Sequence, residues 1–182
     1  MYENPNFNSN NEKILCEMNG KNANMLMDIR TKVLKAGESF TICDANNETA
    51  ILLLSGDVEY SFDGKTENAK RENQFKDRPY CVHFSRNNEA TVTANADSRV
   101  LIQQTDNEND FGFYWYSPEN VILQEFGKDQ WNGTAHRQVL TLFDYENAPY
   151  SNMVLGEVIH KPGCWSSYPP HYHPQPEVYY YE

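Results

Sequence analysis

Short apolar runs separated by turn residues recur along most of this chain. The clearest example covers residues 49–64, where an apolar run ends at Ser55-Gly56, an alternating apolar and polar stretch follows, and Asp63-Gly64 closes the pattern. A continuous apolar run is typical of a buried strand, alternation is typical of a half-buried one, and Asp-Gly favours a tight hairpin turn. The segment therefore predicts a buried strand that meets a hairpin at Ser55-Gly56.

The other strand candidates are short and are bounded by polar turn residues, and hardly any stretch keeps a helical period over three turns. They cover residues 79–84, 90–94, 99–104, 111–116, 121–126, 137–143 and 153–159, with turn chemistry at 127–133 and 144–149. Strands that follow one another at this pace predict an all-β sandwich or barrel.

Two polar segments suggest how the chain is divided. Residues 1–24 are rich in Asn and predict an N-terminal arm, part of it mobile, with ordered structure beginning near Met25. The acidic run 105–110 predicts a linker or long loop. We therefore expect a first β region over residues 25–110 and a second over residues 111–182.

The candidate chemistry lies in the last eighteen residues. His171 and His173 stand two apart, so an extended chain presents both imidazoles to one point, and Glu177 returns a carboxylate to the same side. This donor set suits a divalent transition metal: zinc is favoured, and manganese, iron and nickel are alternatives. The aromatic run 178–181 predicts a strand that places Tyr179 and Tyr181 on the metal side, where we expect them to line a pocket.

Charge and hydropathy narrow the class of partner. The formal net charge is -11 and the pI is about 4.9, which argues against nucleic acid and anionic membranes, because both favour positive charge. A small molecule is the expected ligand. No apolar run approaches the ~20 residues of a membrane span, and no apolar signal-peptide core follows the polar start, so we expect a cytoplasmic protein.

The remaining histidines and the cysteines predict no second metal site. His83 is alone in a strand candidate, where a packed or surface role is commoner than ligation, and His136 and His160 lack ligand spacing. The first half is therefore expected to hold no metal. The cysteines form no C-x-x-C pair and are expected to be reduced thiols, mostly small buried hydrophobes; they are Cys16, Cys43, Cys81 and Cys164.

The terminal motif resembles a known family. H-x-H, three residues and then Glu, opening an aromatic strand, is similar to the first metal motif of the cupin superfamily, and Gly56 with its flanking strands resembles a cupin hairpin. The longer string over residues 163–173 and 177–181 resembles the 5-deoxy-glucuronate isomerase family of inositol catabolism, which is related to 5-dehydro-4-deoxy-glucuronate isomerase of pectin breakdown. Gly156-Glu157-Val158 and Arg137-x-Val139 are also similar to that family.

This resemblance implies an all-β bicupin whose second half is incomplete in the chain as given. Only Pro174-Gln175-Pro176 separates His173 from Glu177, where many members carry a longer acidic insertion. A cupin's fourth ligand is a histidine on a later strand, and no such strand precedes Glu182. We therefore expect either part of a longer protein or a second barrel completed by another chain.

The implied activity is the isomerisation of an aldose to a ketose, converting 5-deoxy-glucuronate to 5-dehydro-2-deoxy-gluconate with a divalent metal. A sugar acid needs a cationic anchor, and Arg137 and Lys161 are the cations nearest to the motif in sequence. A plain surface role is the commoner one for both, and Arg137 is the residue assigned to the substrate pocket. The resemblance leaves the base unassigned and a homo-oligomer open. Trp165 and Tyr168 are expected to be core or interface aromatics.

Other functions remain open beside this one. They are a non-catalytic sugar-binding cupin, a truncated fragment without activity, the pectin-pathway isomerase, and a metal-dependent dioxygenase, which oxygen consumption would distinguish.

Overall fold

The computed structural model describes residues 3–165 and 171–182, and these residues form an almost entirely β protein. The predicted all-β architecture is confirmed. The elements are β1 (Glu12–Cys16), η1 (Ala23–Met25), β2 (Asp28–Leu34), β3 (Ser39–Cys43), β4 (Asn47–Phe62), β5 (Lys65–Arg71), β6 (Cys81–Phe84), β7 (Glu89–Ala94), β8 (Ser98–Asp106), β9 (Phe113–Tyr116), β10 (Ile122–Phe126), η2 (Trp131–Gly133), β11 (Arg137–Phe143) and β12 (Leu155–His160).

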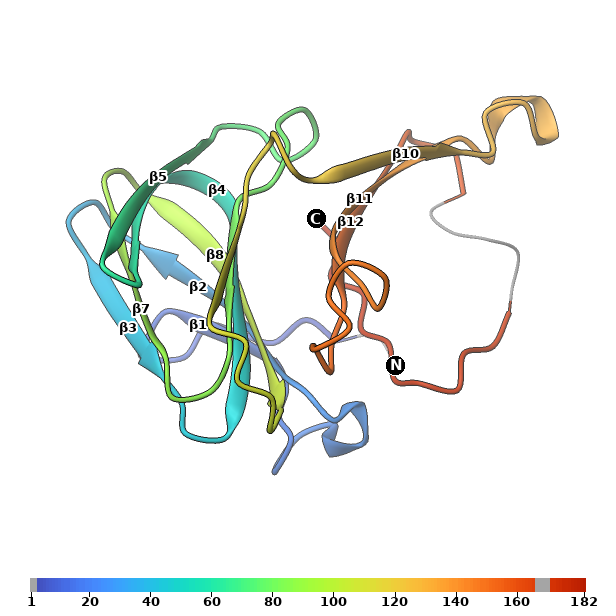
Figure 1. The fold of residues 1–182 in the computed structure, drawn as a ribbon. Helices are drawn as coiled ribbons and strands as arrows, with labels where there is room; N and C mark the ends of the chain where they lie inside the picture. The colour runs from blue at the N-terminus through green and yellow to red at the C-terminus, as the bar shows by residue number, and fades with distance from the viewer. Residues whose placement is uncertain (1–2, 166–170) are drawn as a thin grey trace.

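Nine strands curl into a barrel that occupies one side of the molecule (Figure 1). The order β1-β2-β8-β4-β6-β9 forms one wall, and β4 also pairs with β5 and β7, while β7 pairs with β3. The first part of β4 pairs with β8 and β6, and its last part pairs with β5 and β7. This long strand therefore joins the two walls of the barrel.

The change of wall takes place at Gly56, where the sequence predicted a break between two strands. That expectation was wrong: the strand bends and continues, with a register shift against β8 between Leu53 and Ser55. Gly56 has φ +118°, and a Cβ there would lie 2.1 Å from Ser98 Oγ. Glycine is required at this bend because both the dihedral angle and the space exclude a side chain. The predicted turn at Asp63-Gly64 does join β4 to β5.

The continuous apolar run of β4 is explained by burial on both faces. Ile51 and Leu53 belong to the core inside the barrel, together with Tyr60. Leu52 and its neighbours on the opposite face belong to a second core, which also contains Phe143 of β11. The first part of β4 therefore separates two hydrophobic cores. Its residues are apolar on both faces, so the sequence shows no alternation of apolar and polar residues there.

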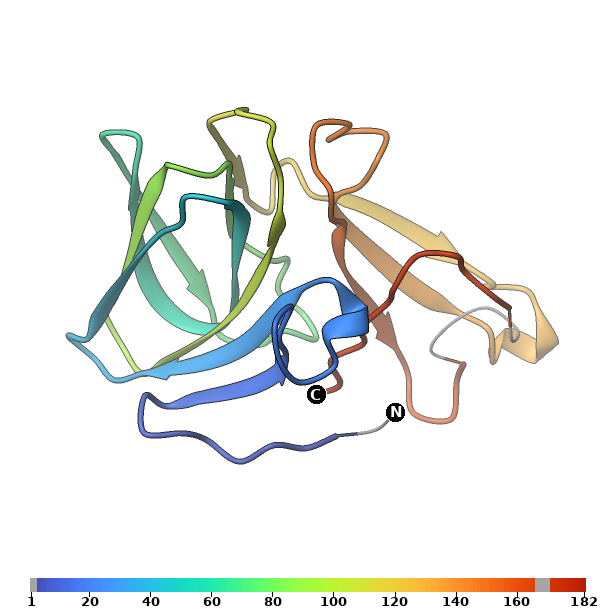
Figure 2. The same cartoon turned by 90° about the horizontal axis from the view of Figure 1, so that it is seen from below.

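The second core is closed by a small antiparallel sheet of order β10-β11-β12, which stands beside the barrel in Figures 1 and 2. Leu140 and Leu142 of β11 are buried in this core. On the opposite face, Ile122, Phe126 and Val158 remain partly exposed. The small sheet thus covers the outside of the barrel with one face and leaves the other open.

Three further segments differ from the sequence-based expectations. Ordered structure begins before Met25, because β1 pairs with β2 and buries Cys16. The run 105–110 is not a free linker: β8 extends to Asp106, and Asn107 is buried. Strand β9, expected to open the second half, pairs with β6 and belongs to the barrel.

Candidate functional site

The two motif histidines lie close together, as their spacing predicts for an extended chain. Their Nε2 atoms are 2.7 Å apart, and the rings meet edge to face with centroids 4.5 Å apart. Glu177 follows on the same side, with its Oε1 3.8 Å from His173 Nε2. His173 therefore lies in contact with His171 and near Glu177.

These donors fit a divalent transition metal in chemistry, because neutral imidazole and carboxylate are its ordinary ligands. In the structure the two imidazoles contact each other directly, with no space for a metal ion between their Nε2 atoms. Within residues 3–165 and 171–182, no group of three His, Cys, Asp or Glu side chains is arranged to hold a metal ion. The metal site therefore stays a prediction that rests on the types and proximity of His171, His173 and Glu177.

The aromatic residues after the motif alternate in their environment. Tyr179 donates to Glu177 Oε1 at 3.4 Å and stacks with Tyr181, and both rings are largely exposed. Val178 and Tyr180 pack against the second core instead. The predicted strand over residues 178–181 is absent, because the described part of the chain offers this segment no ladder partner.

The end of this segment contacts the barrel. Glu182 accepts hydrogen bonds from Arg99 Nη2 at 2.5 Å and from Gln74 Nε2 at 2.6 Å. Burial, together with the neighbouring Glu182 carboxylate, raises the pKa of Tyr180 to about 12. The residues that follow the motif are thereby attached to the first half.

The predicted anchor Arg137 is buried, so it is not a plain surface charge. Its guanidinium lies 5.4 Å from the centroid of the Phe126 ring and donates to the Ala135 carbonyl at 3.2 Å. It pairs across the sheet with His160, which is exposed, as is Lys161. Whether Arg137 contacts a substrate remains a prediction.

The other side chains singled out in the sequence are distributed over both halves. His136 Nε2 lies 3.7 Å from Glu125 Oε1 on the neighbouring strand. Trp165 packs on Trp131 with ring centroids 5.1 Å apart, while Tyr168 lies outside the described residues. All four cysteines are free thiols; Cys16 and Cys81 are buried, Cys164 is partly buried and Cys43 is exposed.

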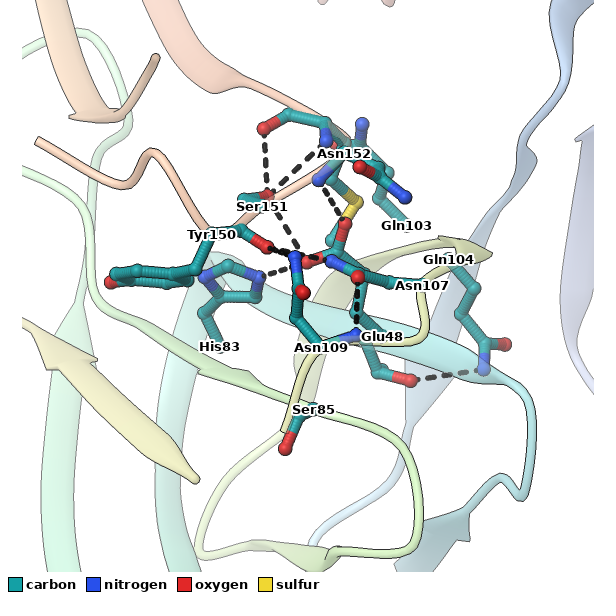
Figure 3. Close-up of polar contacts among 12 residues, drawn as sticks. Glu48, His83, Ser85, Gln103, Gln104, Asn107, Asn109, Tyr150, Ser151 and Asn152 are labelled. Atoms are coloured by element: carbon teal, nitrogen blue, oxygen red, sulfur yellow. Dashed lines mark hydrogen bonds and ion pairs between the residues drawn. The ribbon is translucent and has the colours of Figure 1, made fainter. Parts of the chain in front are cut away.

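Sequence reasoning missed a buried polar cluster between the barrel and the small sheet. Figure 3 shows the Glu48 side chain at its centre. Its carboxylate accepts from His83 Nε2 at 2.9 Å, from the Ser151 hydroxyl at 3.0 Å and from the Asn152 backbone N–H at 2.6 Å. Glu48 and His83 are both fully buried. The only signal in the sequence was a glutamate adjoining a buried apolar run, which does not reveal its partners.

Additional polar contacts hold the same part of the chain to the barrel. Asn107 and Asn109 both donate to the carbonyl of Tyr150, at 2.8 and 2.9 Å. The Asn152 amide donates to the Asp106 carbonyl at 2.8 Å. The acidic run that looked like a linker is therefore a docking surface for the segment that leads into β12.

A buried ion pair forms a second connection. Arg71, at the end of β5, is fully buried and binds both carboxylate oxygens of Glu157 on β12, at 2.7 and 2.6 Å. Its remaining donors bond the carbonyls of Leu53, Gln74 and Asp77. The barrel thus fixes β12, the strand that precedes the histidine motif.

Comparison with known proteins identifies the family. The model of the KduI/IolB family matches residues 1–182. The chain belongs to the KduI/IolB family. Proteins named 5-deoxy-glucuronate isomerase are similar to it: that of Bacillus licheniformis is 27% identical and that of Bacillus subtilis (strain 168) is 27% identical, over 93% and 96% of this chain. The chain spans 66% and 68% of the length of these two relatives.

Solved structures agree with this assignment at the level of fold. An IolB-like protein from Salmonella typhimurium LT2 has a TM-score of 0.61 and 22% identity, over 66% of this chain and 46% of that one. A glyoxylate-induced protein from Pseudomonas aeruginosa has a TM-score of 0.56 at 9% identity, over 73% of this chain and 48% of that one. These likenesses in fold agree with the all-β architecture of this chain. No helix in the described residues has the length and apolar character to cross a membrane.

Proposed function

We propose that this chain belongs to a metal-dependent aldose–ketose isomerase that converts 5-deoxy-glucuronate to 5-dehydro-2-deoxy-gluconate in inositol catabolism. The observation that carries the proposal is the proximity of His171, His173 and Glu177 in a KduI/IolB family chain. The names of the relatives support the sugar acid as substrate. Zinc is the proposed metal, with manganese, iron and nickel as alternatives.

The reaction moves one proton from C2 to C1 of the sugar and the proton of the C2 hydroxyl to the C1 oxygen, so the aldehyde becomes a hydroxymethyl group and the C2 hydroxyl becomes a ketone. A bound metal supplies Lewis-acid polarisation of the two sugar oxygens. His171, His173 and Glu177 would hold that metal, and Glu177 would be neutralised by it. Tyr179, whose hydroxyl contacts Glu177, lies beside the motif and is our candidate for the general acid or base. Arg137 is the proposed anchor of the sugar carboxylate.

The test combines metal analysis with an anaerobic assay. The purified protein is stripped with a chelator and reloaded with zinc or manganese, and elemental analysis gives the stoichiometry. Conversion of 5-deoxy-glucuronate is followed by proton NMR. We expect one metal per chain and conversion without oxygen, with both lost in the His171→Ala, His173→Ala double variant. A ligand loss should lower kcat/KM by at least ~100-fold, because it removes the group that polarises the substrate.

The control is His160→Ala, which removes an exposed histidine on β12 outside the motif. This variant should keep the metal and the activity. Full activity in the His171→Ala, His173→Ala variant would refute the metal assignment. Conversion of 5-dehydro-4-deoxy-glucuronate in place of 5-deoxy-glucuronate would assign the chain to the pectin-pathway reaction.

A second candidate is a non-catalytic sugar-binding cupin. It is favoured by the arrangement of the motif, in which the described residues bring no three donors to one metal position. Under this alternative, calorimetry would detect binding of the sugar acid while NMR detected no conversion at any metal loading.

A further inference from the structure

Residues 150–154, which we name the docking segment, connect the loop after β11 to β12 and lie against the barrel. Two of their contacts are made to the fully buried Glu48: the Ser151 hydroxyl and the Asn152 N–H both donate to its carboxylate. The position of this carboxylate therefore contributes to the binding of the segment, beside the hydrogen bonds from Asn107 and Asn109 and the one to the Asp106 carbonyl. His83 is the residue that fixes the Glu48 carboxylate from the barrel side, 2.9 Å away.

The surroundings of His83 favour the neutral imidazole. The ring is fully buried, is stacked on Phe143 with centroids 4.1 Å apart and an interplanar angle of 8°, and lies 4.8 Å from the Phe111 ring. Nε2 faces Glu48, whereas the buried Nδ1 has no hydrogen-bond partner among the residues that the structure describes. The neutral ring with its proton on Nε2 donates to Glu48 and leaves only a lone pair unpaired. Protonation would add an N–H at Nδ1 with no acceptor, inside an apolar contact.

Three other titratable side chains face His83 from the elements packed against it. Glu48 faces it from β4, Tyr114 lies opposite it on β9, and Tyr150 approaches it from the docking segment. Burial raises the pKa of Tyr150 well above its ordinary range, so this phenol stays neutral. Burial also lowers the pKa of His83, an effect larger than the opposing effect of Glu48.

We propose that Glu48 and His83 form a pH-sensitive latch, which holds the docking segment on the barrel while His83 is neutral and releases it when His83 becomes protonated. The sign follows from linkage. A histidine whose pKa is lower in the folded state contributes stability that is complete above its ordinary pKa of about 6.5, and this contribution is lost as the pH falls through the folded-state pKa. Acidification therefore loosens β12 and the motif that follows it.

The backbone N–H of Asn152 reports on the latch directly, because it donates to Glu48 at 2.6 Å. Hydrogen exchange of the ¹⁵N-labelled protein is measured from pH 8 to pH 5 and expressed as protection factors. We expect the protection of Asn152 to fall at least ~10-fold below pH 6, in parallel with the NMR titration of the His83 ring. The amide of Ile51, inside β4, should keep its protection.

His83→Gln tests the cause. Glutamine retains an N–H donor for Glu48 but does not titrate, so Asn152 should stay protected at pH 8 and lose the additional acid sensitivity. His160→Gln, at an exposed position on β12, should leave the acid response unchanged. If the docking segment is already released in His83→Gln at pH 8, this variant cannot report on the acid response. The latch is then tested by whether the loss of Asn152 protection in the wild-type protein follows the titration of His83.

Three results would overturn the latch. They are constant protection of Asn152 down to pH 5, a fall at a pH where His83 does not titrate, and an equal fall at Ile51, which would indicate global unfolding.

Discussion

The ion pair between Arg71 and Glu157 allows a quantitative test of how the two halves are joined. Replacing Arg71 with Met keeps a side chain of similar length but removes every donor. Glu157 would lose both of its short hydrogen bonds, and the carbonyls of Leu53, Gln74 and Asp77 would lose theirs. The side chain of Arg71 is 0% exposed and that of Glu157 is 17% exposed, so water compensates only part of this loss.

Removing one partner of a buried ion pair costs about 3–5 kcal/mol, because the other charge is left without compensation. We take about 4 kcal/mol for Arg71→Met, since Glu157 retains limited contact with water while the carbonyl bonds add to the cost. In a chain of this size each kcal/mol corresponds to about 2–4 °C in Tm, so the midpoint should fall by about 8–16 °C.

Urea unfolding followed by circular dichroism measures the change in the free energy of unfolding. The matched control is Lys70→Met on the same strand, where Lys70 pairs with Glu72 at 3.0 Å and both side chains are exposed. Exposed pairs contribute little, so this control should change stability by less than about 1 kcal/mol.

A double-mutant cycle with Glu157→Gln isolates the pair itself. We expect a coupling energy of about 1–3 kcal/mol between the two substitutions. A coupling near zero, or equal losses in Arg71→Met and Lys70→Met, would refute the view that this pair connects the halves.

Two further substitutions test the bend of β4 and the second core. Gly56→Ala should destabilise the protein by more than about 2 kcal/mol, since its Cβ would lie 2.6 Å from Ser98 Cα, whereas Gly64→Ala, at φ +67° with open space, should cost only about 1 kcal/mol. Similar losses for the two glycines in urea unfolding would contradict the steric argument. Phe143→Ala should cost about 3–5 kcal/mol in the same assay, because a fully buried ring that also covers His83 is removed. A loss below about 1 kcal/mol would show that the second core does not depend on this ring.

Several elements of the fold could be predicted because local pattern and final environment agree. β11 coincides with the predicted strand over residues 137–143, and the Asp63-Gly64 turn forms where its residues favour it. The break predicted at Ser55-Gly56 was wrong, because a glycine that permits a sharp bend resembles a glycine that ends a strand. The choice between them depends on Ser98 of β8, which lies against Gly56 in space but far from it along the chain.

In the candidate site, too, some features follow from the local sequence and others depend on distant residues. The H-x-H spacing brings His171 and His173 together without help from distant residues, since neighbouring side chains of an extended segment share a face. The strand expected after Glu177 did not form, because a strand needs a partner and the described residues supply none there. For Arg137 a plain surface role was weighed against that of a substrate anchor, and the sheet buries this side chain over Phe126.

The sequence by itself determined the β class, most strand positions, the terminal motif and, through the extended motif string, the family. Only the tertiary structure decided that Glu48 lies against His83 and that Arg71 lies against Glu157, pairs separated by 35 and 86 residues. The physical reason is that spacing along the chain fixes which side chains share a local face. The partner of a buried charge is fixed instead by how the sheets pack, which depends on the whole chain.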